Sequence, residues 1–156
     1  MARIIEARDA LKQLIDTHWP VEDRESADDE VLTPWVFRVE AEKVKGRKVF
    51  VFASAYTAEL ATRASDRGDY TFVILVVERY REQGDPPDEW IDGRVNFVEW
   101  LSNVTGDVRG PRLLATNSRD GLWPEVAEVE TVYDTEELTE RKLFVSVLNI
   151  TYREEG

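Results

Sequence analysis

The residue types that usually carry catalysis are scarce in this chain. It holds one histidine, His18, and no cysteine, which excludes disulfides, thiolate zinc sites and a cysteine nucleophile. A zinc site would need carboxylates for nearly all of its ligands. A Ser-His-Asp triad would need His18 as its base, and no G-x-S-x-G turn accompanies it. His18 is the last residue of a predicted helix, where the helix dipole favours a cation. We therefore interpret it as a helix-terminal residue with a structural role.

Carboxylates are abundant, and two groups of them could do chemistry. Asp28, Asp29 and Glu30 could hold a hard cation such as calcium, but the glycine and ligand spacing of an EF-hand loop is missing. Glu128 and Glu130 lie on one face of a predicted strand and resemble a glycosidase pair. Such a pair needs one acid in an apolar pocket, whereas a solvent-facing strand explains the spacing equally well. Walker A and G-x-G-x-x-G motifs are also missing, so we expect no catalytic residue, no bound metal and no cofactor.

The overall charge of the chain disfavours nucleic acids and anionic membranes as binding partners. The formal net charge is −12, which repels phosphate backbones and anionic membrane surfaces. No segment approaches the roughly 20 apolar residues that span a bilayer, and the N-terminus lacks the apolar run of a signal peptide. We therefore expect the chain to lie in the cytoplasm of the cell that makes it. The length of 156 residues, 42% of them hydrophobic, predicts one domain with a substantial core.

Two long helices are predicted from apolar spacing. The first covers residues 3–18, where Ile4, Ala7, Leu11, Leu14 and Ile15 share one face. The second begins near Asp88 and closes at Gly106. Residues 57–63 are predicted as a short helix or an ordered loop that Thr57 would cap.

The strands are predicted from alternation and from apolar runs. Residues 35–39 alternate and would form a hairpin with residues 49–53 around a turn at 45–47. Residues 70–80 are apolar on both faces, which predicts a central strand with Val73 buried. A turn at 66–69 would precede it. Further strands are predicted at 126–133 and 143–152, with a short one at 112–115. The acidic segments 21–30 and 134–140 are predicted as loops. The fold class is therefore α+β: a central, mostly antiparallel sheet with two main helices packed on it.

Two of the five tryptophans fall outside these periodic elements. Trp19 and Trp123 each precede a proline, and tryptophan is enriched in binding hot spots. We interpret both as candidate interface anchors, while the other tryptophans are expected to be core.

Two blocks of sequence, together with the N-terminal helix, resemble a known family. One block is residues 47–80, RKVFVFASAYTAELATRASDRGDYTFVILVVERY. The other is IDGRVNFVEWLSNV, residues 91–104, followed after a long loop by RKLFVSVLNITYRE, residues 141–154. Their layout and texture are similar to those of the tail terminator, or tail completion, proteins of long-tailed bacteriophages.

The resemblance implies a non-enzymatic virion protein, assembled in the host cytoplasm and located at the tail–neck junction. It implies a homo-oligomeric ring, usually of six copies, that caps the tail tube, contacts the tube protein and the neck or head-completion protein, and lets DNA pass through its lumen without sequence-specific binding. A ring needs two different contact surfaces on each copy, and strand edges can provide them. The candidate interface residues are Trp19, Trp123, Glu22, Asp23, Asp28, Asp29, Glu30, Glu136 and Glu137. The acidic ones could face the lumen, an adjoining ring or solvent.

Two other functions stay open on the sequence alone. A head-closure protein or another neck component shares this size and acidity. A small carboxylate-dependent enzyme or ligand-binding domain belongs to a different class and would show a deep pocket instead of an assembly.

Overall fold

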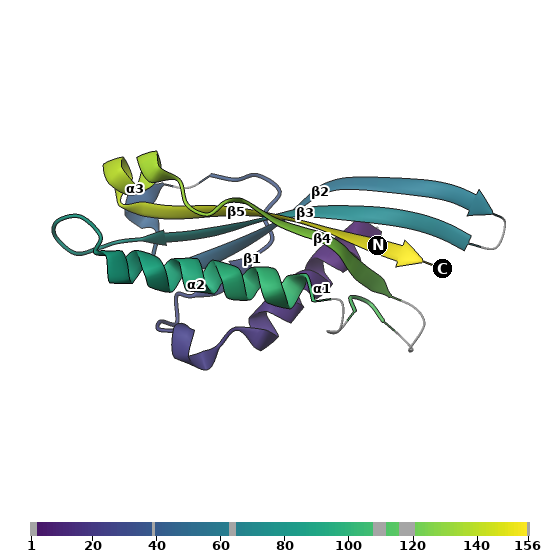
Figure 1. The fold of residues 1–156 in the computed structure, drawn as a ribbon, viewed down its shortest axis with the longest axis horizontal. Helices are drawn as coiled ribbons and strands as arrows, with labels where there is room; N and C mark the ends of the chain where they lie inside the picture. Colours follow the sequence, from purple (N-terminus) through teal and green to yellow (C-terminus); the bar gives the residue numbers. More distant parts are fainter. Residues whose placement is uncertain (1–2, 39, 63–64, 108–111, 116–120, 156) are drawn as a thin grey trace.

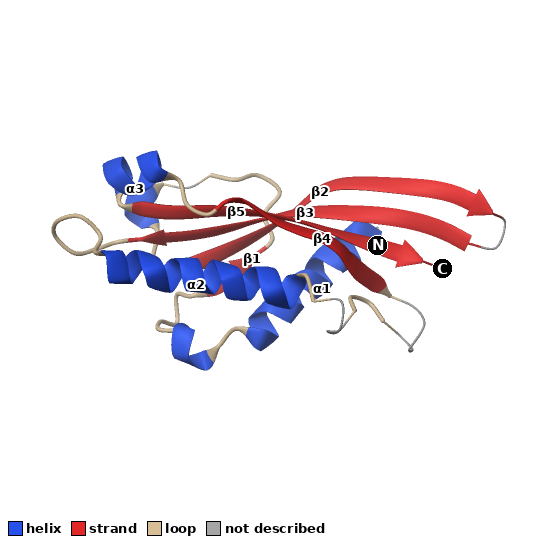
Figure 2. Ribbon diagram, in the orientation of Figure 1, coloured by secondary structure: helices blue, strands red, loops and turns tan. Residues whose placement is uncertain are grey.

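The structure is a computed structural model that describes residues 3–38, 40–62, 65–107, 112–115 and 121–155. In these described residues the sheet has the strand order β1-β2-β3-β5-β4, and three α-helices accompany it (Figures 1 and 2). β1 pairs with β2 in parallel, and the other pairs are antiparallel. The predicted α+β class is confirmed. The elements are α1 (Arg3–His18), β1 (Glu30–Leu32), β2 (Arg47–Thr62), β3 (Ser65–Arg79), α2 (Asp88–Thr105), β4 (Leu122–Thr131), α3 (Thr135–Arg141) and β5 (Leu143–Glu155), with 3-10 turns η1 (Val21–Asp23) and η2 (Ala41–Lys43).

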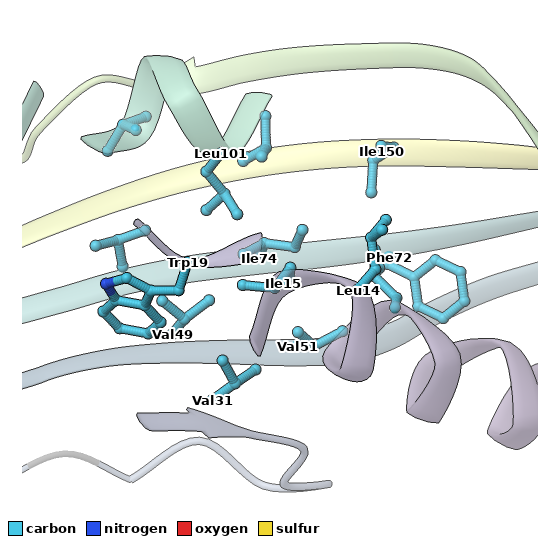
Figure 3. Packing of buried hydrophobic residues seen from close by; sticks show 14 of the residues in the cluster. Leu14, Ile15, Trp19, Val31, Val49, Val51, Phe72, Ile74, Leu101 and Ile150 are labelled. Atoms are coloured by element: carbon cyan, nitrogen blue, oxygen red, sulfur yellow. The ribbon is translucent and has the colours of Figure 1, made fainter. Parts of the chain in front are cut away.

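Both long helices form where the apolar spacing predicts them, and they cover one face of the sheet. Leu11 and Ile15 of α1 and Leu101 of α2 have no exposed surface. They meet strand side chains such as Val49 and Ile74 in one continuous core (Figure 3). Gly106 caps α2 with its N–H on the Ser102 carbonyl. The sequence folds this way because each helix has one apolar stripe that only the sheet can bury.

The two faces of the central strand β3 differ in burial. Phe72, Ile74 and Val76 point into the helix-covered core and are at most 1% exposed. On the other face Val77 is buried with Val44 and Leu143 in a small second cluster. Val73, which lies on that other face farther along the strand, is only half-buried. The central position predicted for this strand is confirmed, but the prediction that Val73 is fully buried is wrong.

The predicted strand at residues 35–39 does not form. Residues 33–38 have no strand structure, Val39 lies outside the described residues, and Trp35 and Phe37 are 63% and 42% exposed. The predicted hairpin is also wrong, because β2 pairs with the short strand β1 and with β3. β1 lies at the end of the predicted loop 21–30, where Val31 is buried in the core at 4% exposure.

The helix or loop predicted at residues 57–63 and the turn predicted at 66–69 are both strand. β2 continues to Thr62, Arg63 lies outside the described residues, and β3 begins at Ser65. The two strands pair along this whole length, with register shifts between Ala53 and Ala55 and between Leu60 and Thr62. The result is a long hairpin whose far end extends past the helical layer (Figure 1).

The acidic segment before the last strand forms a helix instead of the predicted loop. The Asp134 carboxylate accepts the Glu137 N–H and so caps α3, and Leu138 packs into the core. The short strand predicted at residues 112–115 is reduced to an isolated bridge between Leu113 and Leu122. β4 begins and ends earlier than predicted, and β5 is central as predicted but longer.

Candidate functional site

His18, Glu128 and Glu130, which the sequence offered for catalysis, are dispersed and exposed. His18 lies at the end of α1 with Nδ1 3.0 Å from the Leu14 carbonyl oxygen. Glu128 and Glu130 lie on the open face of β4, where Glu130 accepts a hydrogen bond from Asn149 at 3.0 Å. No group of three or more His, Asp or Glu side chains among the described residues is placed to hold a metal ion.

Asp29 has a structural role inside the chain. It is 5% exposed, and its Oδ1 accepts the Arg47 backbone N–H at 2.7 Å. Its Oδ2 accepts the N–H groups of Glu25 and Ser26 at 2.9 and 3.2 Å. One carboxylate thus fixes the loop against the start of β2. Buried in this way, Asp29 cannot act as a surface contact.

The other acidic candidates remain at the surface. Glu22, Asp28, Glu30 and Glu136 are exposed, and Asp23 and Glu137 are half-buried. Glu30 pairs with Lys48 at 2.6 Å, and Glu137 approaches Arg141 at 3.7 Å. α3 and the segment after α1 lie towards the same end of the long axis, opposite to the far end of the β2–β3 hairpin (Figure 1). Two of the acidic segments of the chain therefore lie towards one end of the molecule, where basic side chains such as Arg79, Arg141 and Lys142 also line the surface.

The two candidate tryptophans have different surroundings. Trp19 is 4% exposed and packs on Phe97 with ring centroids 4.9 Å apart, so it belongs to the core and not to a contact surface. Its position four residues after Ile15 continues the apolar face of α1, a signal that would have placed it correctly. Trp123 is 38% exposed on β4, with the Arg112 guanidinium 4.6 Å from its ring centre.

The exposed large apolar side chains of the sheet gather at its two opposite margins. Beside the β1–β2 margin lie Trp35, Val36 and Phe37; at the β4 margin lie Trp123 and Val126. Phe37 contacts the rings of Phe50 and Phe52 on β2 edge-on, and the Arg8 guanidinium lies 4.9 Å from the Trp35 ring centre. Clustered exposed aromatics of this kind mark binding surfaces. Trp35 and Phe37 were predicted to be strand residues with one buried face, so the sequence did not indicate them as contacts.

An open cleft of about 640 Å³ is lined in part by Glu78, Trp90 and Arg94, and it is the place to test the alternative of a carboxylate enzyme. The Glu78 carboxylate accepts from Arg47 Nε at 2.7 Å and from Arg94 Nη2 at 2.6 Å. The side chains of Arg47, Glu78 and Arg94 are only 4%, 13% and 11% exposed. Both carboxylate oxygens are therefore occupied, and this buried Arg-Glu-Arg triad joins β2, β3 and α2 instead of offering a free acid or base.

Tyr152 fixes the end of β5 to the end of α2. Its buried hydroxyl donates to the Thr105 carbonyl oxygen at 2.7 Å, and burial raises its pKa well above the usual value of 10.0. This contact sets the position of the β5–β4 half of the sheet under the helices.

Replacing Tyr152 by Phe should lower the free energy of unfolding by about 1–2 kcal/mol at pH 8, because the Thr105 carbonyl loses its buried donor. Above pH 10, Tyr152 loses its proton in the unfolded state but keeps it in the folded state. The free energy of unfolding of the wild type therefore falls as the pH rises, and the Phe variant lacks this contribution. Urea titrations should show the stability gap shrinking by about 1.4 kcal/mol by pH 11. A gap that stays constant would contradict the assigned burial of the hydroxyl.

Among the described residues, no helix combines the length and the apolar character needed to cross a membrane.

The fold and the surface features together define a small α+β protein with exposed apolar side chains at two sheet margins and no assembled catalytic group in its described part. No family model and no curated protein matches the sequence. Among solved structures, the chain is similar to a chain in the virion of a native gene transfer agent (GTA) particle, with a TM-score of 0.53 and 13% identity. The match covers 100% of both chains. At this identity the likeness shows a shared fold.

Proposed function

We propose that the chain is a structural virion protein that forms a ring of six copies, which caps the tail tube and joins the tail to the neck or head. The observation that carries the proposal is the match in fold, over the full length of both chains, to a chain of a virion particle. The resemblance of the sequence to tail terminator proteins supports the same assignment independently of that match.

The surfaces of the molecule fit a ring. A closed ring of identical copies requires two different contact surfaces on each copy, and the two apolar margins of the sheet lie on opposite sides of the molecule. The partners proposed from the resemblance are further copies of the chain, the tail tube protein and a neck or head-completion protein. The role is non-enzymatic and needs no cofactor.

The acidic segments 21–30 and 134–140 fit a passage for DNA or a contact with a basic partner. A charge of −12 per copy multiplies in a ring and repels DNA, and salt screens the repulsion over about 10 Å at 0.1 M. If these segments meet a partner ring instead, their acids fix the alignment of the two rings more than they add affinity. Neutralising Glu22, Asp23, Asp28 and Glu30 while keeping Asp29 separates the two roles: slower DNA ejection indicates the lumen, and unjoined tails indicate the partner.

The proposal is tested by locating the chain in particles made by the cell that encodes it. Gold bound to a tagged copy should mark one position, the junction of tail and neck, and deletion of the chain should give separate heads and tails. Joined, DNA-filled particles formed without the chain would overturn the proposal.

A further inference from the structure

We propose that β4 of one copy pairs with the free edge of β2 in the next copy, and that residues 35–37 cover the joint. This inference rests on the proposed function, because it names the contact by which the ring closes.

The outer edge of β2 is long and has no strand beside most of it in the described structure. β1 pairs only with residues 48–50 of β2, which leaves residues 51–62 open on that side. Residues 50–58, FVFASAYTA, contain no charge and no proline, and Ser54 and Ala55 are exposed. Proteins normally shorten, charge or cover such an edge, since it would otherwise pair with other chains. An uncharged open edge of this length therefore indicates a strand partner.

The opposite edge of the sheet offers a strand of complementary character. β4 pairs with β5 on one side; on the other side, among the residues that the structure describes, a single bridge from Leu113 reaches its first residue, Leu122. Along its open part Val126 is 55% exposed, and the exposed acids Glu128 and Glu130 alternate with half-buried residues. Its backbone groups and the exposed side chains of Val126 and Trp123 are thus available to a neighbour.

Charge selects the pairing of unlike edges. If β4 paired with β4 of another copy, Glu128 and Glu130 would lie beside the same acids, which is unfavourable across a strand pair. The β2 margin instead presents the exposed Arg38 directly after the aromatic residues. Phe37 is already seated on Phe50 and Phe52 at the beginning of the free edge, so an incoming β4 would bury the Trp35–Phe37 side chains against Val126. A β2–β2 pair would close as a dimer and leave β4 open.

Because the natural chain has no cysteine, introduced cysteines report the contact directly. We expect the double variant Ala55→Cys/Val126→Cys, treated with a short bis-maleimide linker that tolerates a small offset in register, to give a ladder of covalent oligomers on a denaturing gel. An equal mixture of the two single variants should stop at the covalent dimer. Each single variant alone should stay at the mass of one chain, and so should Thr17→Cys/Glu99→Cys, whose exposed sites lie on the helical layer.

A charge placed at the contact should weaken the ring without unfolding the chain. Val126→Lys is expected to raise the concentration needed for assembly at least tenfold, while Val21→Lys, at a more exposed valine away from both edges, leaves it unchanged. Measured at concentrations below assembly, the unfolding midpoints of both variants should match the wild type.

The outcomes distinguish this contact from the ring itself. Covalent dimers from Ala55→Cys alone would show β2–β2 pairing, and dimers from Val126→Cys alone would show β4–β4 pairing; either overturns the inference. Assembly of native mass without any ladder would keep the ring and reject this contact. A chain that is monomeric at every concentration would reject the proposed function as well.

Discussion

Replacing Glu78 by Gln is expected to lower the free energy of unfolding by about 3–5 kcal/mol, because it removes the counter-charge of the buried Arg47 and leaves Arg94 only the exposed Glu25 at 3.8 Å. Arg47 Nε and Arg94 Nη2 both donate to this carboxylate, at 2.7 and 2.6 Å. The rings of Phe97 and Trp90 lie 4.4 Å from the two guanidinium carbons. These ring contacts do not replace the negative charge that the substitution removes. Urea unfolding followed by tryptophan fluorescence measures the loss.

An exposed ion pair provides the matched control for the triad. Glu40 binds Lys43 at 2.8 Å with side chains 64% and 79% exposed, so Glu40→Gln should change stability by about 0.5 kcal/mol or less. Replacing the whole triad by Arg47→Met, Glu78→Leu and Arg94→Met should cost less than Glu78→Gln alone, since no charge then stays buried. Equal effects of Glu78→Gln and Glu40→Gln would contradict the burial of the triad.

Replacing Ile74 by Asp is expected to remove 4 kcal/mol or more of stability, roughly the range for an unpaired charge in a core, and to leave little folded protein. Ile74 has no exposed surface and lies between the sheet and the helices (Figure 3). The change both deletes an apolar side chain and buries a carboxylate. Circular dichroism at 25 °C, followed by thermal unfolding, measures the result.

Val73 is the neighbouring control on the opposite face of the same strand. Val73 is half-buried, so the carboxylate of an introduced Asp would keep contact with water. Val73→Asp should therefore lower the free energy of unfolding by only about 1–2 kcal/mol. The difference between the two variants reports that helices cover only one face of the sheet. Similar losses in both variants would mean that another layer covers Val73.

The two long helices and the central strand were predictable because each follows a single period over many residues. The apolar stripe of residues 3–18 and the run at 70–77 each have one plausible structure. β1 was not predictable, because three residues in an acidic stretch have no period, and Val31 is buried only once β1 pairs with β2 and packs into the core under α1. The far end of the β2–β3 hairpin was missed for a related reason. Residues 57–62 include good helix formers, and their strand conformation depends on long-range pairing with β3.

One missed element did carry a local signal. Asp134 followed by Glu137 has the spacing of a helix N-terminal capping box, and α3 begins where that signal places it. The role of Asp29 and the buried triad had no such signal, because the partners that join them to other elements are 16 to 31 residues away in the chain. The exposed aromatics at residues 35–37 were misjudged because their alternation is typical of a strand. Alternation indicates two different faces but does not require a neighbouring strand.

The native mass of the purified chain, measured across a range of concentrations at roughly 0.15 M ionic strength, tests the central claim most directly. The proposed ring predicts a single assembled species at about six times the 18.0 kDa of one chain. It also predicts that the chain does not form open-ended polymers. A mass of 18.0 kDa at every concentration, or a species that stops at twice this value, would contradict the ring.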